Sequence, residues 1–111
     1  MDQNIFTNKL NNWKTEIQKD EWFFSNFRES LIKKISDEEA FLAISQLCEI
    51  INQSEDSYFI SELLEILLAL ARKSNTTELP DGLANTLIKL GFDSNLQNII
   101  SNIKEFYRLN W

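Results

Sequence analysis

The sequence predicts an all-α protein of about six amphipathic helices arranged in antiparallel hairpins. The 111 residues include only two Gly and one Pro, and valine is absent. Strands favour runs of β-branched residues between turn residues, and this sequence has few such runs. Its apolar residues instead recur at spacings of three and four, which is the period of a helix.

The chain is predicted to be one domain, residues 1–111. A hydrophobic content of 43% with 25% charged residues is typical of a globular protein. Helices joined by short loops pack antiparallel, and such hairpins either close into a compact bundle or stack as a HEAT-like α-solenoid. The sequence leaves both arrangements open, and of the possible oligomeric states it favours a monomer.

The first two helices are indicated by apolar stripes. The first spans residues 3–18, with a stripe made of Phe6, Leu10, Trp13 and Ile17. Asp20 can cap the second helix. The stripe of that helix is made of Phe23, Phe27, Leu31 and Ile35, and Phe24 widens it. Trp22 projects away from the stripe and is expected to cover a neighbouring helix, with contact to a partner as the alternative.

The third and fourth helices carry the clearest signals. Ser36 followed three residues later by Glu39 is a capping box, so the third helix begins there and is expected to end near Asn52. After the polar break NQSEDS, the fourth helix spans about residues 58–73. Its apolar residues cover more than half of the helical wheel, which predicts packing on several sides.

The last two helices follow the polar connector SNTTELPDG. Pro80 suits the first turn of the fifth helix, and Gly91 suits a left-handed cap at its end. Asp93 or Ser94 is expected to cap the sixth helix. Its apolar face is made of Leu96, Ile99, Ile100, Ile103, Phe106 and Tyr107.

We find no motif for catalysis, a metal or a cofactor, so we do not expect an enzyme. The chain has no His, the commonest general base and metal ligand. Gly82 and Gly91 are isolated, which excludes a Gly-rich phosphate loop. The acidic stretches SDEE and SEDS lack the ligand spacing of a calcium loop. The lone Cys48 lies on an apolar helix face and is expected to be a core residue rather than a nucleophile.

Composition also limits the partners and the compartment. A net charge of −6 has the wrong sign for binding the phosphate backbone of nucleic acids. The longest apolar-rich run, residues 60–71, is far shorter than the roughly 20 residues of a membrane span. The N-terminus lacks the apolar core of a signal peptide, and a single Cys cannot form an internal disulfide, so we expect a cytoplasmic location.

Negative charge is concentrated in one third of the chain. Residues 36–71 contain eight carboxylates and no Lys or Arg, whereas the other residues carry a net charge of +2. In projection, Glu38 and Glu49 lie on the polar side of the third helix, with Leu42 in its middle.

The fourth helix repeats this pattern, with Tyr58, Glu62 and Glu65 on its narrow polar stripe. If the two helices form an antiparallel hairpin, one surface would present Leu42 and Tyr58 among about six carboxylates. Such a field speeds association with a cationic partner. The alternative is a solvated face, because charged residues on the outside of helices need no partner.

The helical pairs resemble those of a known group of proteins. The capped pair SDEEAFLAISQLCEIINQ and SYFISELLEILLALA is followed by the short pair LPDGLANTLIKLG and SNLQNIISNIKEFY. The chain from Ser36 to Trp111 resembles the small helical immunity proteins of bacterial polymorphic toxin systems. The shared features are this pattern of helical pairs, the acidity and the lack of His. Contact-dependent growth inhibition is one of these toxin systems. The immunity proteins that this chain resembles are built of HEAT-like hairpins. The first two helices share the likeness only weakly.

The resemblance implies a binding protein without catalytic residues that holds a cognate toxin, often a basic nuclease, and blocks or distorts its active site. Acidic side chains would then take the place of the substrate phosphates. Under this hypothesis, the toxin contacts Glu38, Leu42, Glu49, Asp56, Tyr58, Glu62 and Glu65. Leu42 and Tyr58 would be the desolvated anchors, and the acids would steer the partner.

Two other functions remain open. A helical adaptor or regulatory subunit would bind a peptide or helix in a groove between hairpins, through apolar contacts that tolerate high salt. The other is an enzyme with an unusual carboxylate site, for which no sequence feature argues.

Overall fold

The structure is a computed structural model that describes residues 6 and 10–111, and all regular elements within these residues are helical. The first helices are α2 (Trp13–Lys19) and α3 (Phe23–Lys34). The long helices α4 (Asp37–Gln53) and α5 (Ser57–Ser74) follow. The chain continues with α6 (Leu83–Leu90), the 3₁₀ helix η1 (Ser94–Leu96) and α7 (Gln97–Tyr107). The predicted all-α fold of six helices is confirmed for the described residues.

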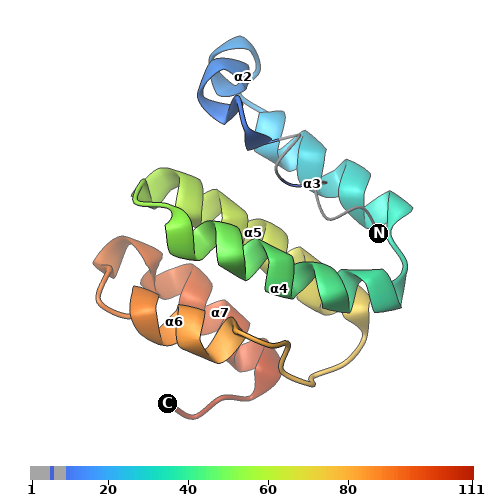
Figure 1. The fold of residues 1–111 in the computed structure, drawn as a ribbon, viewed down its shortest axis with the longest axis vertical. Coiled ribbons are helices and arrows are strands. Elements are labelled where there is room, and N and C mark those ends of the chain that lie inside the picture. The colour runs from blue at the N-terminus through green and yellow to red at the C-terminus, as the bar shows by residue number, and fades with distance from the viewer. Residues whose placement is uncertain (1–5, 7–9) are drawn as a thin grey trace.

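The helices lie in two layers (Figure 1). α4 and α5 form an antiparallel hairpin, α6 packs on α4, and α7 packs on α5. α3 packs on α5 from the other side. One layer therefore holds α3, α5 and α7, and the other holds α4 and α6. The shortest dimension of the molecule is 20 Å, about two helix diameters. The result is a compact globule in which hairpins are stacked side by side.

The core lies between the two layers and surrounds α5. Ten of the 18 residues of α5 are buried. Leu63, Leu64 and Leu67 have no accessible surface. The prediction that this helix packs on several sides is confirmed. Across residues 6 and 10–111, no helix has both the length and the apolar character that crossing a membrane requires.

The ends of α4 and α5 follow the sequence signals. The Ser36 hydroxyl accepts a hydrogen bond from the Glu39 N–H at 3.1 Å, and the Glu39 carboxylate accepts one from the Ser36 N–H at 3.1 Å. The predicted capping box is therefore formed, and these bonds hold the pKa of Glu39 below its ordinary value. α4 ends at Gln53, next to the predicted end. Asp56 caps α5 by accepting the Phe59 N–H at 3.0 Å.

The first predicted helix is interrupted. Asn11 and Asn12 form a turn immediately before α2. The Asn12 carbonyl accepts the Glu16 N–H at 3.0 Å and so begins the new helix. Asn side chains compete with helical hydrogen bonding, which explains why two in succession separate α2 from the residues before it. The parts of the prediction at residues 3–5 and 7–9 lie outside the described residues.

The start of α3 also differs from the prediction. The helix begins at Phe23 with Trp22 at its N-cap, because Asp20 already ends α2 in an extended conformation. The Asp20 carboxylate accepts hydrogen bonds from the Trp22 N–H at 2.9 Å and from the Asn26 side chain at 3.3 Å. Asp20 therefore stabilises the turn between α2 and α3 rather than capping α3.

The start of α6 lies later than predicted. Pro80 is predicted in the first turn, but the helix begins at Leu83. The reason is Gly82, whose φ of 86° is left-handed and cannot continue a right-handed helix. Pro80 is buried, and its carbonyl accepts the Leu83 N–H at 3.3 Å, so it belongs to the turn that leads into α6.

The end of α6 corrects another prediction. Gly91 has a φ of −62°, so it is not the left-handed cap predicted for it. The chain turns directly into η1, which Asp93 caps by accepting the Asn95 N–H at 2.9 Å. The predicted sixth helix therefore starts as a 3₁₀ turn capped by Asp93, and α7 itself begins at Gln97 with Leu96 at its N-cap and no side-chain cap. Left-handed caps occur instead at Asn75 and Arg108.

Candidate binding surface

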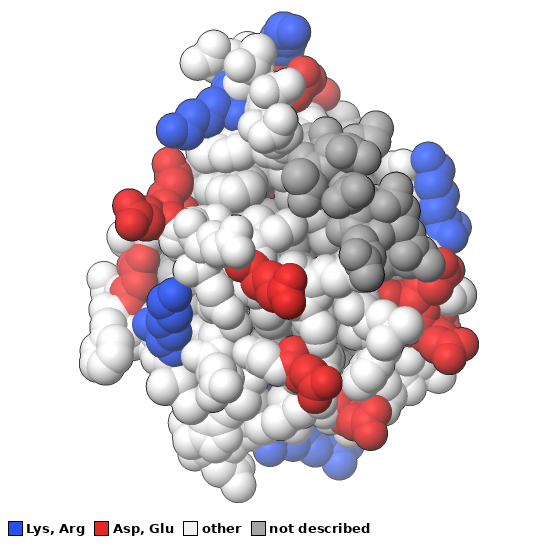
Figure 2. Space-filling model, viewed as in Figure 1, with Lys and Arg blue, Asp and Glu red and all other residues white. Residues whose placement is uncertain are grey.

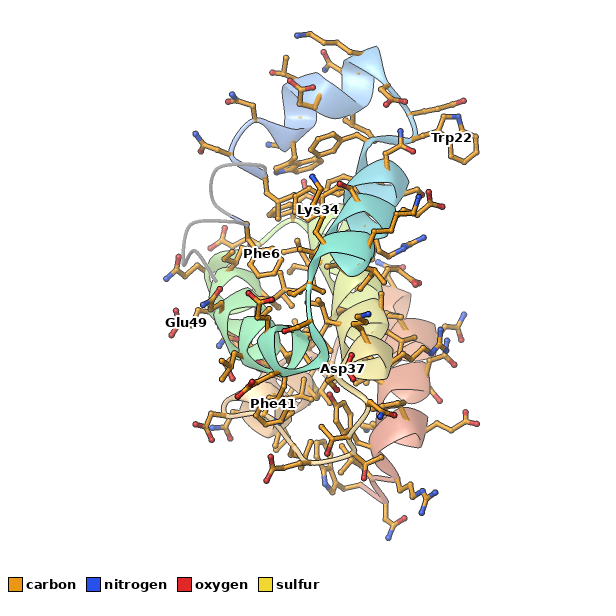
Figure 3. The ribbon with its side chains drawn as sticks, turned by 90° about the vertical axis from the view of Figure 1, so that its right-hand side faces the viewer. Phe6, Trp22, Lys34, Asp37, Phe41 and Glu49 are labelled. Carbon is orange, nitrogen blue, oxygen red and sulfur yellow. The ribbon has the colours of Figure 1, made fainter. Side chains whose placement is uncertain are left out.

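The first group of predicted contact residues lies on the outer side of α4. Glu38, Leu42 and Glu49 are exposed, and Leu42 has 57% of its surface accessible. Figure 3 shows Glu49 projecting away from the helix. Figure 2 shows carboxylates across the middle of the face formed by α4 and α6, with basic side chains mainly at its margins. The α4 part of the predicted surface is therefore exposed and carries negative charge.

The second group begins with Tyr58 at the start of α5. This side chain is 46% exposed, and its ring lies 5.9 Å from the ring of Trp13 and 6.1 Å from that of Phe24. Trp13 also stacks on Phe59 at 4.7 Å, so Tyr58 forms one edge of an aromatic cluster. Burial raises the pKa of Tyr58, and the neighbouring Glu62 raises it further. The periodicity places Trp13 on an apolar stripe, but it cannot show that the ring supports Tyr58.

The two acids that follow on α5 lie in different environments. Glu62 is half-buried, whereas Glu65 is exposed. Burial raises the pKa of Glu62, the guanidinium of Arg28 opposes this effect, and Glu65 adds to it, with a net increase. Glu62 thus has a positive charge nearby in α3. Glu65, like the acids on α4 at positions 38 and 49, has no ion-pair partner among the residues described.

The structure does not bring the two predicted anchors together. Asp37 at the start of α4 and Lys73 near the end of α5 form an ion pair at 3.9 Å, which shows that these two residues lie level in the hairpin. In that register Tyr58 is level with the end of α4, and Leu42 lies about 15 Å away along the helix axis at 1.5 Å per residue. The predicted contact residues therefore form one group on α4 and another on α5. The exposed Asp56 lies in the turn between these helices.

Besides Tyr58, three described aromatic residues are exposed, and these are Trp22, Phe92 and Trp111. Trp22 is predicted to cover a neighbouring helix, but 62% of its surface is accessible, and it projects from the start of α3 (Figure 3). Phe92 is 96% exposed. It lies in the turn between α6 and η1, outside every helical stripe, so the periodicity does not identify it as a contact residue. The sequence signal that could have identified Phe92 as a contact residue is the presence of an aromatic residue in a short polar turn.

Cys48 is a core residue, as predicted. It is 2% exposed, and burial raises its pKa to about 11. The thiol is therefore protonated near neutral pH, and a protonated thiol is a poor nucleophile. In the part of the chain that the structure describes, no three His, Cys, Asp or Glu side chains are grouped so that they could hold a metal ion.

A cleft of about 310 Å³ runs along α3. It is lined by Asp20, Phe23, Asn26, Phe27, Ser30, Leu31 and Lys34. Apolar rings and a leucine thus alternate with polar side chains. The cleft has the size and character of a site for an apolar side chain or a short peptide segment.

Comparison with protein-family models, with curated proteins and with solved structures finds no match to this chain.

Proposed function

We propose that this chain is an immunity protein that binds and neutralises a cationic protein toxin through its acidic helical surface. The observation that supports this is the separation of charge: residues 36–71 hold eight carboxylates and no basic residue, and they make up α4 and most of α5, whose basic residues Arg72 and Lys73 lie in its last turn. Glu38, Glu49 and Glu65 are exposed on that hairpin. A field of this sign attracts a basic protein and repels nucleic acid.

A basic nuclease domain is the toxin that the resemblance favours. Such an enzyme holds phosphates with clustered Lys and Arg side chains. Carboxylates of the hairpin would pair with those side chains and prevent the substrate from binding. Leu42 and Tyr58, each about half exposed, would add apolar surface that is desolvated in the complex. Neutralisation of this kind requires binding and no catalytic residue.

Co-expression tests the proposal. The C-terminal domain of the protein encoded immediately upstream is expressed in a bacterial host, with and without this chain, and growth is measured. We expect the domain to be toxic and this chain to relieve its toxicity. Killing that continues in the presence of this chain would contradict the proposal. A harmless neighbour would favour the adaptor function.

Charge reversal tests which acids contact the toxin. The double variant Glu38→Lys, Glu49→Lys reverses the α4 group, and Glu65→Lys reverses the exposed acid of α5. Glu62 is left unchanged, because a lysine there would lie near Arg28. Each variant is expected to weaken toxin binding about tenfold or more, mostly through slower association, as measured by surface plasmon resonance.

A matched control separates this effect from a general change in charge. Glu105→Lys makes the same substitution at an exposed position on α7. All variants should keep the helical circular-dichroism spectrum of the wild type. If Glu105→Lys weakens binding as much as the other variants, or if none of them does, the acidic surface of the hairpin is not the contact.

The cleft on α3 supports a second candidate function, a helical adaptor. Phe23, Phe27 and Leu31 in its lining would bury the apolar side of a peptide or helix. Such contacts depend little on ionic strength, whereas contacts of the acidic surface weaken as salt screens them. A complex whose affinity is unchanged between about 0.05 and about 0.5 M salt would favour the adaptor.

A further inference from the structure

Phe92 is the most exposed of the large apolar side chains that the structure describes, at 96%. Ile88, four residues earlier on α6, is 58% exposed. Aromatic side chains bury a large apolar area when they enter a core, yet Phe92 contributes almost none of its surface to this one. Aromatic residues are also enriched among the few residues that dominate binding energies at interfaces.

The backbone on both sides of Phe92 is held in place. The Gly91 N–H donates to the Ile88 carbonyl at 3.2 Å, and the Asp93 N–H donates to the Leu90 carbonyl at 3.1 Å. The side-chain amide of Gln97 donates to the carbonyls of Gly91 and Asp93, at 3.0 and 2.9 Å. The turn therefore presents the aromatic ring from an ordered backbone. A partner that binds it pays little of the entropy of ordering a loop.

A second turn is tied to this one. The Ser57 hydroxyl donates a hydrogen bond to the Asp93 carboxylate, which joins the turn between α4 and α5 to the turn between α6 and η1. Both turns lie at the same edge of the molecule, at the left of Figure 1. The first of these turns carries Glu55 and Asp56, which are both exposed. A fully exposed aromatic ring thus shares an edge with carboxylates.

The charges of this edge favour a cationic partner. Lys89 is the basic residue of α6, and its ammonium group donates to the Asn52 carbonyl at 2.9 Å. The carboxylates of Glu55, Asp56 and Asp93 outnumber this single positive charge, so the edge is negative. A second copy of this chain would bring the same carboxylates face to face, and like charges placed opposite each other are unfavourable. The charges therefore favour a basic protein over self-association.

We propose that this edge docks a basic protein that accepts the Phe92 ring in an apolar pocket. We call it the turn edge and define it as Glu55, Asp56, Ile88, Phe92 and Asp93. The proposal rests on the proposed function and names the surface that captures the toxin. It adds residues that the sequence does not identify, since only Asp56 belongs to the predicted set. The ring supplies the apolar anchor, and the surrounding carboxylates pair with basic side chains around the pocket.

The test is the affinity of the purified upstream toxin domain for the full chain, measured by isothermal titration calorimetry. Phe92→Ala is expected to weaken binding at least tenfold, because truncating an aromatic residue that is buried at an interface typically has an effect of this size. Its unfolding midpoint should stay at the wild-type value, because the ring packs on almost nothing. Trp22→Ala is the matched control, since it removes another exposed aromatic side chain, from α3, and should keep wild-type affinity.

A second pair of variants tests the charges. Glu55→Lys is expected to slow association with the toxin domain several-fold, whereas Glu105→Lys on α7 should not. Asp56 is not substituted, because it caps α5.

The outcomes separate the turn edge from the proposed function. Tight binding by the wild type that neither Phe92→Ala nor Glu55→Lys weakens overturns the turn edge alone. No binding by the wild type overturns the immunity function and the turn edge together. A dimer of the free chain that dissociates in the Phe92→Ala variant, seen by analytical ultracentrifugation, would assign the edge to a second copy instead.

Discussion

The eight carboxylates of residues 36–71 differ in what surrounds them. Asp37 pairs with Lys73, and Glu39 and Asp56 complete helix caps. Glu62 is half-buried near Arg28. The remaining four are exposed, and these are Glu38, Glu49, Glu55 and Glu65. The sequence shows the charge of the segment but cannot separate acids that hold the fold from acids that are free for a partner.

The half-buried Glu62 predicts a pH-dependent stability. Its pKa in the folded chain is raised above the ordinary value of 4.5. The folded state therefore binds this proton more readily than the unfolded state. The charged side chain opposes folding at neutral pH, and this effect disappears as the pH falls through the folded pKa towards 4.5. Glu62→Gln should thus be more stable than the wild type at pH 7, with a gain that vanishes below about pH 4.5.

Urea unfolding at a series of pH values measures this difference. Glu38→Gln is the control, because it removes an exposed carboxylate. A gain in the Glu62→Gln variant that stays constant from pH 7 down to pH 4 would show that ionisation of Glu62 is not its origin.

Two leucines of the long hairpin should respond very differently to truncation. Leu67 on α5 is fully buried, whereas Leu42 on α4 is 57% exposed. Leu67→Ala removes buried methyl groups and leaves a cavity, so it should lower the free energy of unfolding by about 2–5 kcal/mol. Leu42→Ala should change it by less than about 0.5 kcal/mol. Urea denaturation tests both, and equal losses would mean that Leu42 belongs to the core.

At the scale of elements, the capping box predicts how firmly α4 begins. Ser36→Ala removes the acceptor for the Glu39 N–H and should destabilise the protein by about 1 kcal/mol. Ser101→Ala, at an exposed position within α7, replaces the same residue type and should be neutral or slightly stabilising, because Ala favours helices. Thermal unfolding compares the two variants, and a Ser36→Ala variant as stable as Ser101→Ala would contradict the role of the cap.

The existence of the helices could be predicted, but several of their ends could not. The stripes and the capping box identify α4 and α5 almost to the residue. The errors lie where one residue fixes the backbone. Gly82 takes a left-handed conformation that delays α6, and Gly91 does not take one because the chain turns at once into η1. Asn11 and Asn12 form a turn that divides the first predicted helix. Periodicity describes a face and carries little information about such single dihedral angles.

For the whole molecule, the sequence predicts hairpins but not the order in which they stack. Side-chain contacts between helices fix the neighbours of each helix, and they place Tyr58 beside Trp13 and Phe24. The exposure of Phe92 also follows from this arrangement, since none of the helices that the structure describes packs over its ring. The separation of Tyr58 from Leu42 follows from the antiparallel register of α4 and α5, whereas the aromatic neighbours of Tyr58 and the exposure of Phe92 depend on the packing of the other helices.

The net charge of −6 predicts the salt dependence of the proposed complex. Ions screen exposed charges over about 8 Å at physiological ionic strength and over about 3 Å at 1 M. The association rate with the toxin domain should fall by about tenfold or more between low and high salt, while dissociation changes less. Stopped-flow measurements test this. An association rate independent of salt would show that the negative surface does not steer the encounter.

The central place of α5 determines the order in which parts of the molecule open over time. α5 packs against α3, α4 and α7, whereas the principal neighbour of α2 is α3. The amide protons in the middle of α5 can therefore exchange with solvent only when the whole chain unfolds, and those of α2 exchange through local opening. Hydrogen exchange followed by NMR should find the slowest amides around Leu63 to Leu67. We therefore expect α2 to unfold and refold many times for each opening of α5.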